Sequence, residues 1–158
     1  MVKQNTGGLG FSLIELIFAM AIVTVLTAIG IPTYRGYIDK KNINNAILKI
    51  NAIQVCIERF YTTDFKYPDT IDDIATCLPD KGLDPWGKPY QYLNIIDGGP
   101  GIKGKVRKDH KLNPINTNYD LYSMGKDGVS KTQVSNKDSL DDIIIARDGG
   151  FIGLAADF

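Results

Sequence analysis

Glu15 is the residue of this sequence whose chemistry most needs an explanation. It lies four residues inside an apolar run that begins at Phe11, and the next charged residue along the chain is Arg35. Moving a carboxylate out of water costs free energy, whether its destination is lipid or a protein core. An amine of the same chain or of a neighbouring chain could neutralise it. An apolar segment alone therefore does not explain Glu15.

The other reactive side chains offer little catalytic or metal-binding chemistry. His110 is the single histidine, so a histidine-based metal site or a Ser-His-Asp triad has little to build on. Cys56 and Cys77 are the two cysteines, whereas a structural zinc site usually takes more ligands. No pair of acidic residues has a predictable proximity, and no nucleophile motif occurs. We therefore expect no enzymatic activity and interpret His110 as a solvated surface residue.

The composition limits the classes of partner. The chain has 158 residues, with 18 Lys and Arg against 18 Asp and Glu, so its net charge is zero. This balance gives no electrostatic argument for nucleic acid as a partner. The length suits one domain with a modest core plus one appended element, and the 16 glycines predict a loop-rich part.

The apolar run FSLIELIFAMAIVTVLTAIGI (residues 11–31) is a candidate membrane segment. As a helix it would span roughly 30 Å, about the thickness of the hydrocarbon of a bilayer. Three interpretations are open: a cleaved secretory signal, a plain anchor with Lys3 on the cytoplasmic side, and an anchor cleaved between Gly10 and Phe11. The length and the acidic residue disfavour the first, and the second leaves Glu15 unexplained. Cleavage in the third would create an α-amine close to Glu15 in sequence.

The hexapeptide GFSLIE (residues 10–15), followed by the apolar run, resembles the prepilin signal of type IV pilins and type II secretion pseudopilins. The resemblance implies that a dedicated membrane peptidase cleaves after Gly10 and N-methylates the new first residue, Phe11. Residues 1–10 would then be a leader peptide. Glu15 would pair with the Phe11 amine of an adjacent subunit as helices pack into a filament. An anchor carboxylate that snorkels to the membrane surface is the alternative.

Beyond Pro32 the sequence becomes amphipathic, as expected of a helix that buries one side. We predict one helix from about residue 12 to 61, bent near Gly30 to Pro32, whose first half is apolar all round. In its second half, apolar residues recur at steps of three and four: Ile43, Ile47, Ile50, Ile53, Ile57 and Phe60.

The remaining sequence predicts a small body that covers this apolar stripe. Thr70 could cap a short helix over residues 71–77. If the body is extracytoplasmic, Cys56 on the long helix and Cys77 at the end of the short one could form a disulfide; in the cytosol they would be buried thiols. Apolar and aromatic stretches predict strands at residues 90–95, 106–108, 119–124 and 143–146.

Two stretches of the C-terminal half resemble the major pseudopilins of the general secretion pathway protein G type. One is LDPWGKPYQY (residues 83–92); the other is YDLYSMGKDGV (119–129) with DDI (141–143), which resembles their calcium loop. Calcium takes about six to eight oxygen ligands from carboxylates and carbonyls, and clustered carboxylates repel one another without a cation. The resemblance implies Ca²⁺ ligands from the side chains of Asp127, Asp141 and Asp142 and from the backbone oxygens of Met124 and Val129.

The stretch between these aspartates departs from the family. Residues 130–140 form a longer segment than expected and carry Lys131 and Lys137, and Asp138 could substitute for one aspartate. A solvated acidic turn without metal is the alternative interpretation. The tail from residue 144 to 158 also departs from the family and has no assigned role.

These observations predict an α+β fold: a pilin-like lollipop in which the long N-terminal helix, part membrane segment and part amphipathic, packs on a small antiparallel β-sheet with a C-terminal calcium-type loop. Its parts are the leader peptide (1–10), the transmembrane and assembly helix (11–31) and a periplasmic or extracellular globular domain (32–158).

The resemblance implies a structural filament subunit, the major pseudopilin of a type II secretion system. It would be a single-pass protein of the bacterial inner membrane with its globular domain in the periplasm. Its expected partners are further copies of itself, prepilin peptidase, the inner-membrane assembly platform and ATPase, minor pseudopilins and the membrane. One alternative is a type IV pilin for adhesion, motility or DNA uptake, which the paired cysteines favour. Another is an anchored, calcium-dependent binding module that does not polymerise.

Overall fold

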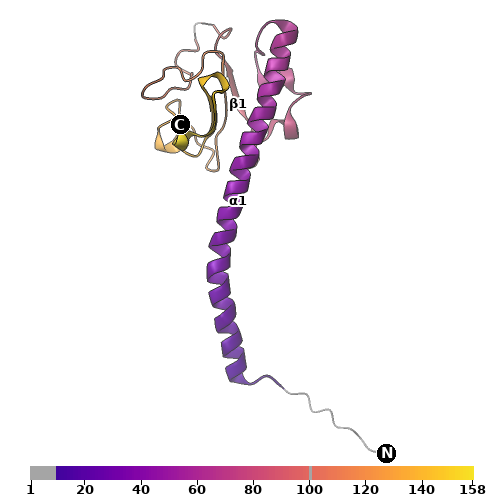
Figure 1. Ribbon diagram of the computed structural model, residues 1–158, viewed down its shortest axis with the longest axis vertical. Helices are drawn as coiled ribbons and strands as arrows, with labels where there is room; N and C mark the ends of the chain where they lie inside the picture. The colour runs from indigo at the N-terminus through magenta and orange to yellow at the C-terminus, as the bar shows by residue number, and fades with distance from the viewer. Residues whose placement is uncertain (1–9, 100) are drawn as a thin grey trace, which may run out of the picture. The chain divides into compact units, whose positions relative to one another are not determined.

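The computed structural model of the protein describes residues 10–99 and 101–158. The chain divides into two compact units, one that ends at Asp39 and one that runs from Lys40 to Phe158. The regular elements, with short 3₁₀ turns in the loops between them, are α1 (Leu13–Asp64), β1 (Gln91–Asn94), β2 (Tyr119–Ser123), β3 (Ile143–Ala146) and β4 (Phe151–Leu154) (Figure 1).

The first unit is the apolar half of α1. The helix begins at Leu13. Ser12, the residue before it, and Glu15 in its first turn form a capping box. Residues 10–37 are all exposed. The helix is long and apolar enough to cross a membrane, with a mean hydropathy of 2.4 in its most apolar 18-residue window. The helix predicted over the apolar run is therefore confirmed.

Three threonine side chains of this apolar half bond to the helix backbone. A threonine hydroxyl that donates to the carbonyl four residues earlier needs no water, which matters in lipid because lipid offers no hydrogen-bond partners. The helix also continues through Pro32 to Asp64, close to the predicted end. Three threonines make such bonds: Thr24 to Met20 (2.7 Å), Thr27 to Val23, and Thr33 to Ile29 (2.9 Å).

In the second unit, α1 buries the apolar stripe that the sequence predicts. Ile50, Ile53 and Ile57 have no exposed surface, and their spacing of three and four places them on one side of the helix. Burying each such side chain contributes about 1.5–3 kcal/mol. The residues that pack with them come from the loops and from the sheet: Tyr67, Ile74, Tyr90, Tyr119, Leu121, Ile143 and Ile145.

The sheet is antiparallel throughout, with the strand order β1-β2-β3-β4. Side chains alternate between its two faces. Ile143 and Ile145 belong to the core against α1, whereas Ile144 belongs to a second core with Ile115 and Val134. The central strand β3 is thus buried on both faces, and the predicted α+β fold is confirmed.

The C-terminal tail forms the edge strand β4, which the sequence analysis did not assign. Phe151 pairs with Ala146, so β3 and β4 make a hairpin. The connection contains Asp148-Gly149, both with positive φ (52° and 96°). An Asp-Gly pair between apolar runs is a strong hairpin signal. The signal was therefore present in the sequence.

The strand predicted at residues 106–108 is wrong. Lys108 makes one isolated parallel bridge with Gln133, and no strand forms there. The reason lies in the neighbouring residue, because the backbone N–H of Arg107 donates to the carboxylate of Asp120 at 2.7 Å instead of to a neighbouring strand. The short helix predicted over residues 71–77 is also shorter, a single 3₁₀ turn over Ile71–Ile74.

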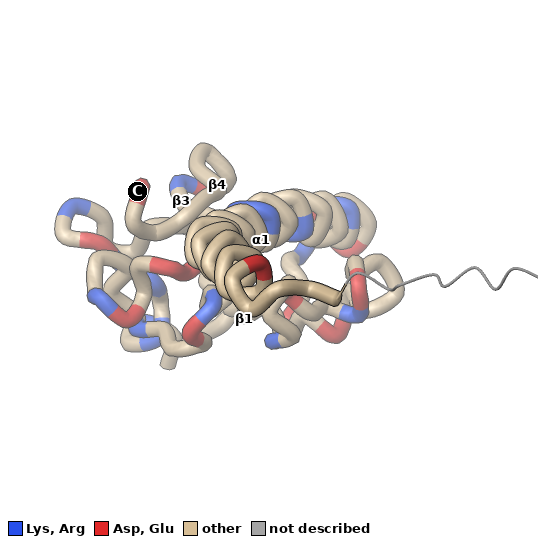
Figure 2. Tube along the Cα trace, turned by 90° about the horizontal axis from the view of Figure 1, so that it is seen from below, with Lys and Arg blue, Asp and Glu red and all other residues tan. Residues whose placement is uncertain are grey.

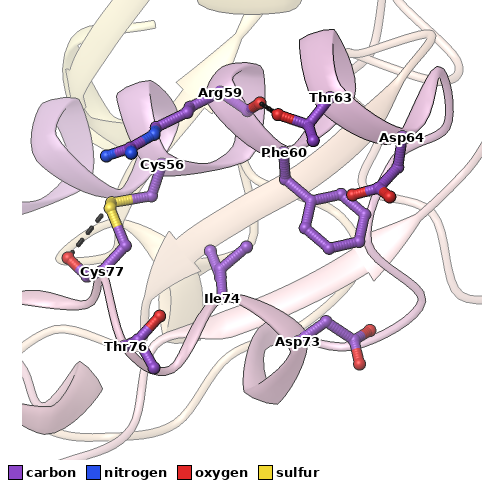
Figure 3. Close-up of a pocket in the computed structure, with 9 residues that line it drawn as sticks. All are labelled: Cys56, Arg59, Phe60, Thr63, Asp64, Asp73, Ile74, Thr76 and Cys77. Carbon is purple, nitrogen blue, oxygen red and sulfur yellow. Dashed lines mark hydrogen bonds between the residues drawn. A yellow bond between two sulfur atoms is a disulfide. The ribbon is translucent and has the colours of Figure 1, made fainter.

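Cys56 of α1 and Cys77 form a disulfide, which confirms that prediction. The bond fastens the loop after α1 to the helix itself (Figure 3). A shallow surface pocket lies beside it, where Phe60 and Ile74 are accompanied by charged groups of both signs, among them Arg59. This mixture of side chains points to no particular ligand.

Candidate functional site

The residues that the sequence singles out for function lie in two places, one in each unit. The first is the N-terminal end of α1, with Gly10, Phe11 and Glu15. The second is the segment between β2 and β3, residues 124–142, which we call the acidic loop. Along the second unit, basic and acidic segments are interspersed and not separated by sign (Figure 2).

At the first place, Glu15 is bonded to Ser12. Its Oε2 accepts hydrogen bonds from the backbone N–H of Ser12 at 2.9 Å and from the hydroxyl at 3.0 Å. This S-x-x-E pattern is the sequence signature of a capping box, which the sequence analysis did not recognise. The cap fixes the carboxylate at the first turn and leaves it exposed. The predicted partner of Glu15, the Phe11 amine of an adjacent subunit, belongs to another chain, so a single chain does not test this prediction.

The predicted cleavage site precedes the helix. Gly10 is exposed, and 88% of the surface of Phe11 is exposed. Because both residues lie before Leu13, the peptide bond between them is not within the helix. Of the predicted leader peptide, residues 1–9 lie outside the described residues.

At the second place, the acidic loop folds back as predicted and brings Asp127 to Asp141. The backbone N–H of Asp127 donates to Asp141 Oδ2 at 3.1 Å, and Asp127 Oδ1 accepts from the N–H of Val129 at 2.8 Å. Gly125 has a φ of +63°, and a Cβ there would collide with the backbone of Asp141. Only glycine therefore fits this close approach.

Asp142, adjacent in sequence to Asp141, has a different environment. Its side chain is 0% exposed, and Oδ2 accepts from Arg107 Nη2 and from Ser130 Oγ, each at 2.6 Å. Burial raises the pKa of Asp142, and the charge of Arg107 opposes that rise. The sequence analysis missed Arg107, because nothing in the basic stretch around it distinguishes this residue from its exposed neighbours.

The arrangement can be compared with what a calcium ion requires. Of the predicted ligands, Met124 O accepts from the N–H of Gly128, and Asp142 is paired with Arg107. Among residues 10–99 and 101–158, no three His, Cys, Asp or Glu side chains lie close enough together to hold a metal ion. One buried oxygen, Asp142 Oδ1, has no hydrogen-bond partner within these residues, but calcium needs about six to eight oxygens. In this arrangement the predicted side-chain ligands do not converge on one point as a calcium ion would require, and calcium binding itself stays an untested prediction.

The DPWG stretch fastens the start of the acidic loop to the body. Asp84 is buried, and its Oδ1 accepts from the N–H groups of Trp86 (3.0 Å) and Lys88 (2.8 Å). Its Oδ2 accepts from the hydroxyl of Ser123 at the end of β2, at 2.6 Å. The side chain of Lys88 lies against Gly128, where a Cβ would collide with it. This motif therefore has a structural role.

The chain is similar in sequence to secretion-system and pilin proteins of several bacteria. Type II secretion system core protein G of Pseudomonas aeruginosa is 28% identical over 137 residues, which cover 75% of this chain and 84% of that protein. The protein of the same name from Aeromonas hydrophila is 27% identical over 141 residues, 78% of this chain and 86% of that protein. Type IV major pilin protein PilE1 of Neisseria gonorrhoeae is 34% identical over 95 residues, 60% of this chain and 56% of that protein.

No family model and no solved structure matches the chain. The identification therefore rests on these relatives, on the GFSLIE segment with its exposed apolar helix, and on the antiparallel sheet packed on the amphipathic half of α1. The chain resembles type IV pilins and type II secretion pseudopilins in sequence, and it has the pilin-like α+β fold that this resemblance implies.

Proposed function

We propose that this chain is the major pseudopilin of a type II secretion system. It is a structural subunit without catalysis, processed by prepilin peptidase and polymerised into a pseudopilus that drives protein export across the outer membrane. The similarity to core protein G of two bacteria over three quarters or more of this chain supports this choice within the family.

One observation carries the proposal: the first half of α1 exposes its apolar side chains on every side. Residues 10–37 are all exposed, and the helix contains a single acidic residue near its start, Glu15. Such a helix requires lipid before assembly and other helices after it. A subunit that is stored in a membrane and then moves into a filament needs a segment that is stable in both environments.

Glu15 gives this helix a means of setting its register. In the membrane its charge is costly, and the bonds from Ser12 offset only part of that cost. In a filament, the methylated amine of Phe11 on a neighbouring copy supplies the opposite charge. A pair that forms at only one position along the helix selects one register among many that apolar packing alone would allow.

The same parts of the chain support the proposed location. The apolar half of α1 crosses the inner membrane once, and the second unit lies in the periplasm. The disulfide between Cys56 and Cys77 supports an oxidising compartment for this unit. The partners of the assembled state are other copies of the chain and the minor pseudopilins. An inner-membrane platform and its ATPase drive assembly.

A type IV pilin is the second candidate, and two observations favour it. PilE1 has the higher identity of the relatives compared, although over a shorter stretch. The disulfide also favours it, because many pilins carry one and major pseudopilins typically do not. The two candidates differ in what is lost when the protein is absent.

Deletion of the gene in the native bacterium separates these candidates. The pseudopilin proposal expects proteins normally found in the medium to accumulate in the periplasm, with surface filaments unchanged. Complementation with the wild-type chain restores export, and complementation with a chain altered at Gly10, which prevents cleavage, does not. Normal export together with loss of surface filaments would assign the chain to the pilins.

A further inference from the structure

Arg107 lies at the centre of a buried polar cluster in the second unit. Only 3% of its side chain is exposed. Nη2 donates to Asp142 Oδ2 and Nη1 donates to Ser130 Oγ, each at 2.6 Å. The guanidinium also lies 4.0 Å from the ring centroid of Tyr122. Ion pairing and stacking on an aromatic ring together hold the group in one position.

The same residue connects segments that are distant in sequence. Its backbone N–H donates to Asp120 Oδ2 at 2.7 Å, and Asn116 Nδ2 donates to Asp120 Oδ1 at 2.9 Å. Its backbone carbonyl accepts from the N–H of Ile115 at 3.0 Å. The cluster thus joins the loop before β2, the strand β2, and the acidic loop, which it contacts at Ser130 and at its last residue, Asp142.

Within the acidic loop, Ser130 bonds to both Arg107 and Asp142. Its hydroxyl accepts from Arg107 and donates to Asp142 Oδ2, so the three side chains form a closed triangle of hydrogen bonds. Asp142 also bonds through its backbone, because its carbonyl accepts from the N–H of Ala155 after β4 at 2.9 Å. The end of the acidic loop is therefore fixed to the body by protein groups.

A buried carboxylate in a protein requires a cation or several hydrogen-bond donors. A metal ion and a guanidinium are alternative solutions, since each neutralises the charge and bonds several oxygens. Here the guanidinium occupies the position next to the buried aspartate, and the exposed Asp127 and partly exposed Asp141 are bonded by backbone N–H groups of the loop itself. Each of these carboxylates has a protein partner.

We propose that Arg107 is the internal cation of the acidic loop, and that this loop folds and stays folded without bound calcium. Ser130, the first residue of the extended stretch (130–140), accepts a hydrogen bond from the guanidinium, which fits this function. The proposal concerns the stability of the second unit and is independent of whether the chain assembles into a pseudopilus or a pilus.

The test uses the full-length chain in detergent micelles. Its melting temperature is measured in millimolar CaCl₂ and in excess EGTA, with MgCl₂ as a control for ionic strength. We expect the melting temperatures to agree within about 1 °C, because a ligand that does not bind the folded state does not stabilise it. Titration calorimetry with CaCl₂ alone should show no saturable binding. A melting temperature several degrees higher in CaCl₂ than in both EGTA and MgCl₂, with saturable binding, would overturn the proposal.

Matched variants test whether Arg107 is the cation that stabilises the acidic loop. Asp142→Asn and Arg107→Met should each lower the melting temperature by roughly 10 °C, and the double variant should fall no further than the worse single one, since both remove the same pair. Asp127→Asn, on the exposed side of the same loop, should change it by no more than about 2 °C. If Arg107→Met does not fold, the calcium comparison on the wild-type chain still decides. Additive losses from Arg107 and Asp142 would contradict the pairing.

Discussion

Glu15 and Asp142 are both carboxylates that need compensation, and they obtain it in different ways. Glu15 is exposed in the first unit, and the hydrogen bonds to it come from Ser12, a neutral residue. Asp142 is fully buried in the second unit and is paired at 2.6 Å with Arg107. The charge of Asp142 is neutralised within its own chain. We propose that the charge of Glu15 is neutralised only by the amine of a neighbouring chain.

This difference separates residues that serve the fold from residues that serve assembly. A charge whose partner lies in the same chain contributes to the stability of the monomer, and its loss appears in an unfolding measurement. A charge whose partner lies in a neighbour contributes nothing there, and its loss appears in the assembled state. Variants of the two regions should therefore fail in different experiments.

The largest expected effect is that of Glu15→Gln on assembly. Loss of the carboxylate removes the pair with the Phe11 amine, and breaking a buried pair costs roughly 3–5 kcal/mol. We expect filaments in sheared or cross-linked membrane fractions to fall at least about a hundred-fold. The melting temperature of the full-length chain in detergent should be unchanged. Normal filament yield from this variant would contradict the role of Glu15 in assembly.

The disulfide is the next largest effect, and it belongs to the fold. Replacing both Cys56 and Cys77 with serine should lower the free energy of unfolding by roughly 3 kcal/mol, because the unfolded chain regains the freedom that the cross-link removed. Urea denaturation of the full-length chain measures this. Reductant should destabilise the wild-type chain by a similar amount and leave the double variant unaffected. A reductant effect on the double variant would mean that the loss has another cause.

Asp84 tests whether the DPWG stretch holds the acidic loop. Asp84→Ala removes the acceptor of the N–H groups of Trp86 and Lys88 and of the Ser123 hydroxyl, which should cost about 2–3 kcal/mol. Ser123→Ala removes one of these bonds and should cost about 1 kcal/mol. Both values come from urea denaturation. Equal losses from the two variants would show that the backbone bonds contribute little.

Ser12→Ala should give the smallest effect, and it separates the role of Glu15 in the helix cap from the role of its charge. It removes the hydroxyl bond to Glu15, and the loss of a helix N-cap costs about 1 kcal/mol. Because the charge of Glu15 remains, we expect filaments to form at near wild-type yield. A loss of filaments as severe as that of Glu15→Gln would mean that Glu15 acts through the cap and not through a neighbouring amine.

The elements with strong local patterns could be predicted from the sequence. The spacing of Ile50, Ile53 and Ile57 gave the buried side of α1, and the apolar run IIIA at residues 143–146 gave β3 with its correct bounds. The capping box at Ser12 and the Asp-Gly turn before β4 had local signals that were overlooked. These features depend on residues close together in the sequence.

The cluster around Arg107 could not be predicted in this way. Arg107 and Asp142 are separated by 35 residues, and Asp120 and Ser130 lie between them in sequence. Which of many basic residues becomes buried depends on how several loops fold together. The strand predicted at residues 106–108 failed for the same reason, because a side chain of β2 took the N–H of Arg107. Long-range polar contacts leave no periodic pattern.

The most direct test of the account is the mass and N-terminus of the chain taken from native membranes. Mass spectrometry of the intact chain, with sequencing of its first peptide, reads both at once. The account predicts a chain that begins at Phe11 and carries one methyl group on its amine, which is the partner required by Glu15. A chain that still begins at Met1 would contradict it, because no amine would then lie near the carboxylate. A chain cut near Gly30 would also contradict it, because that chain would lack Glu15.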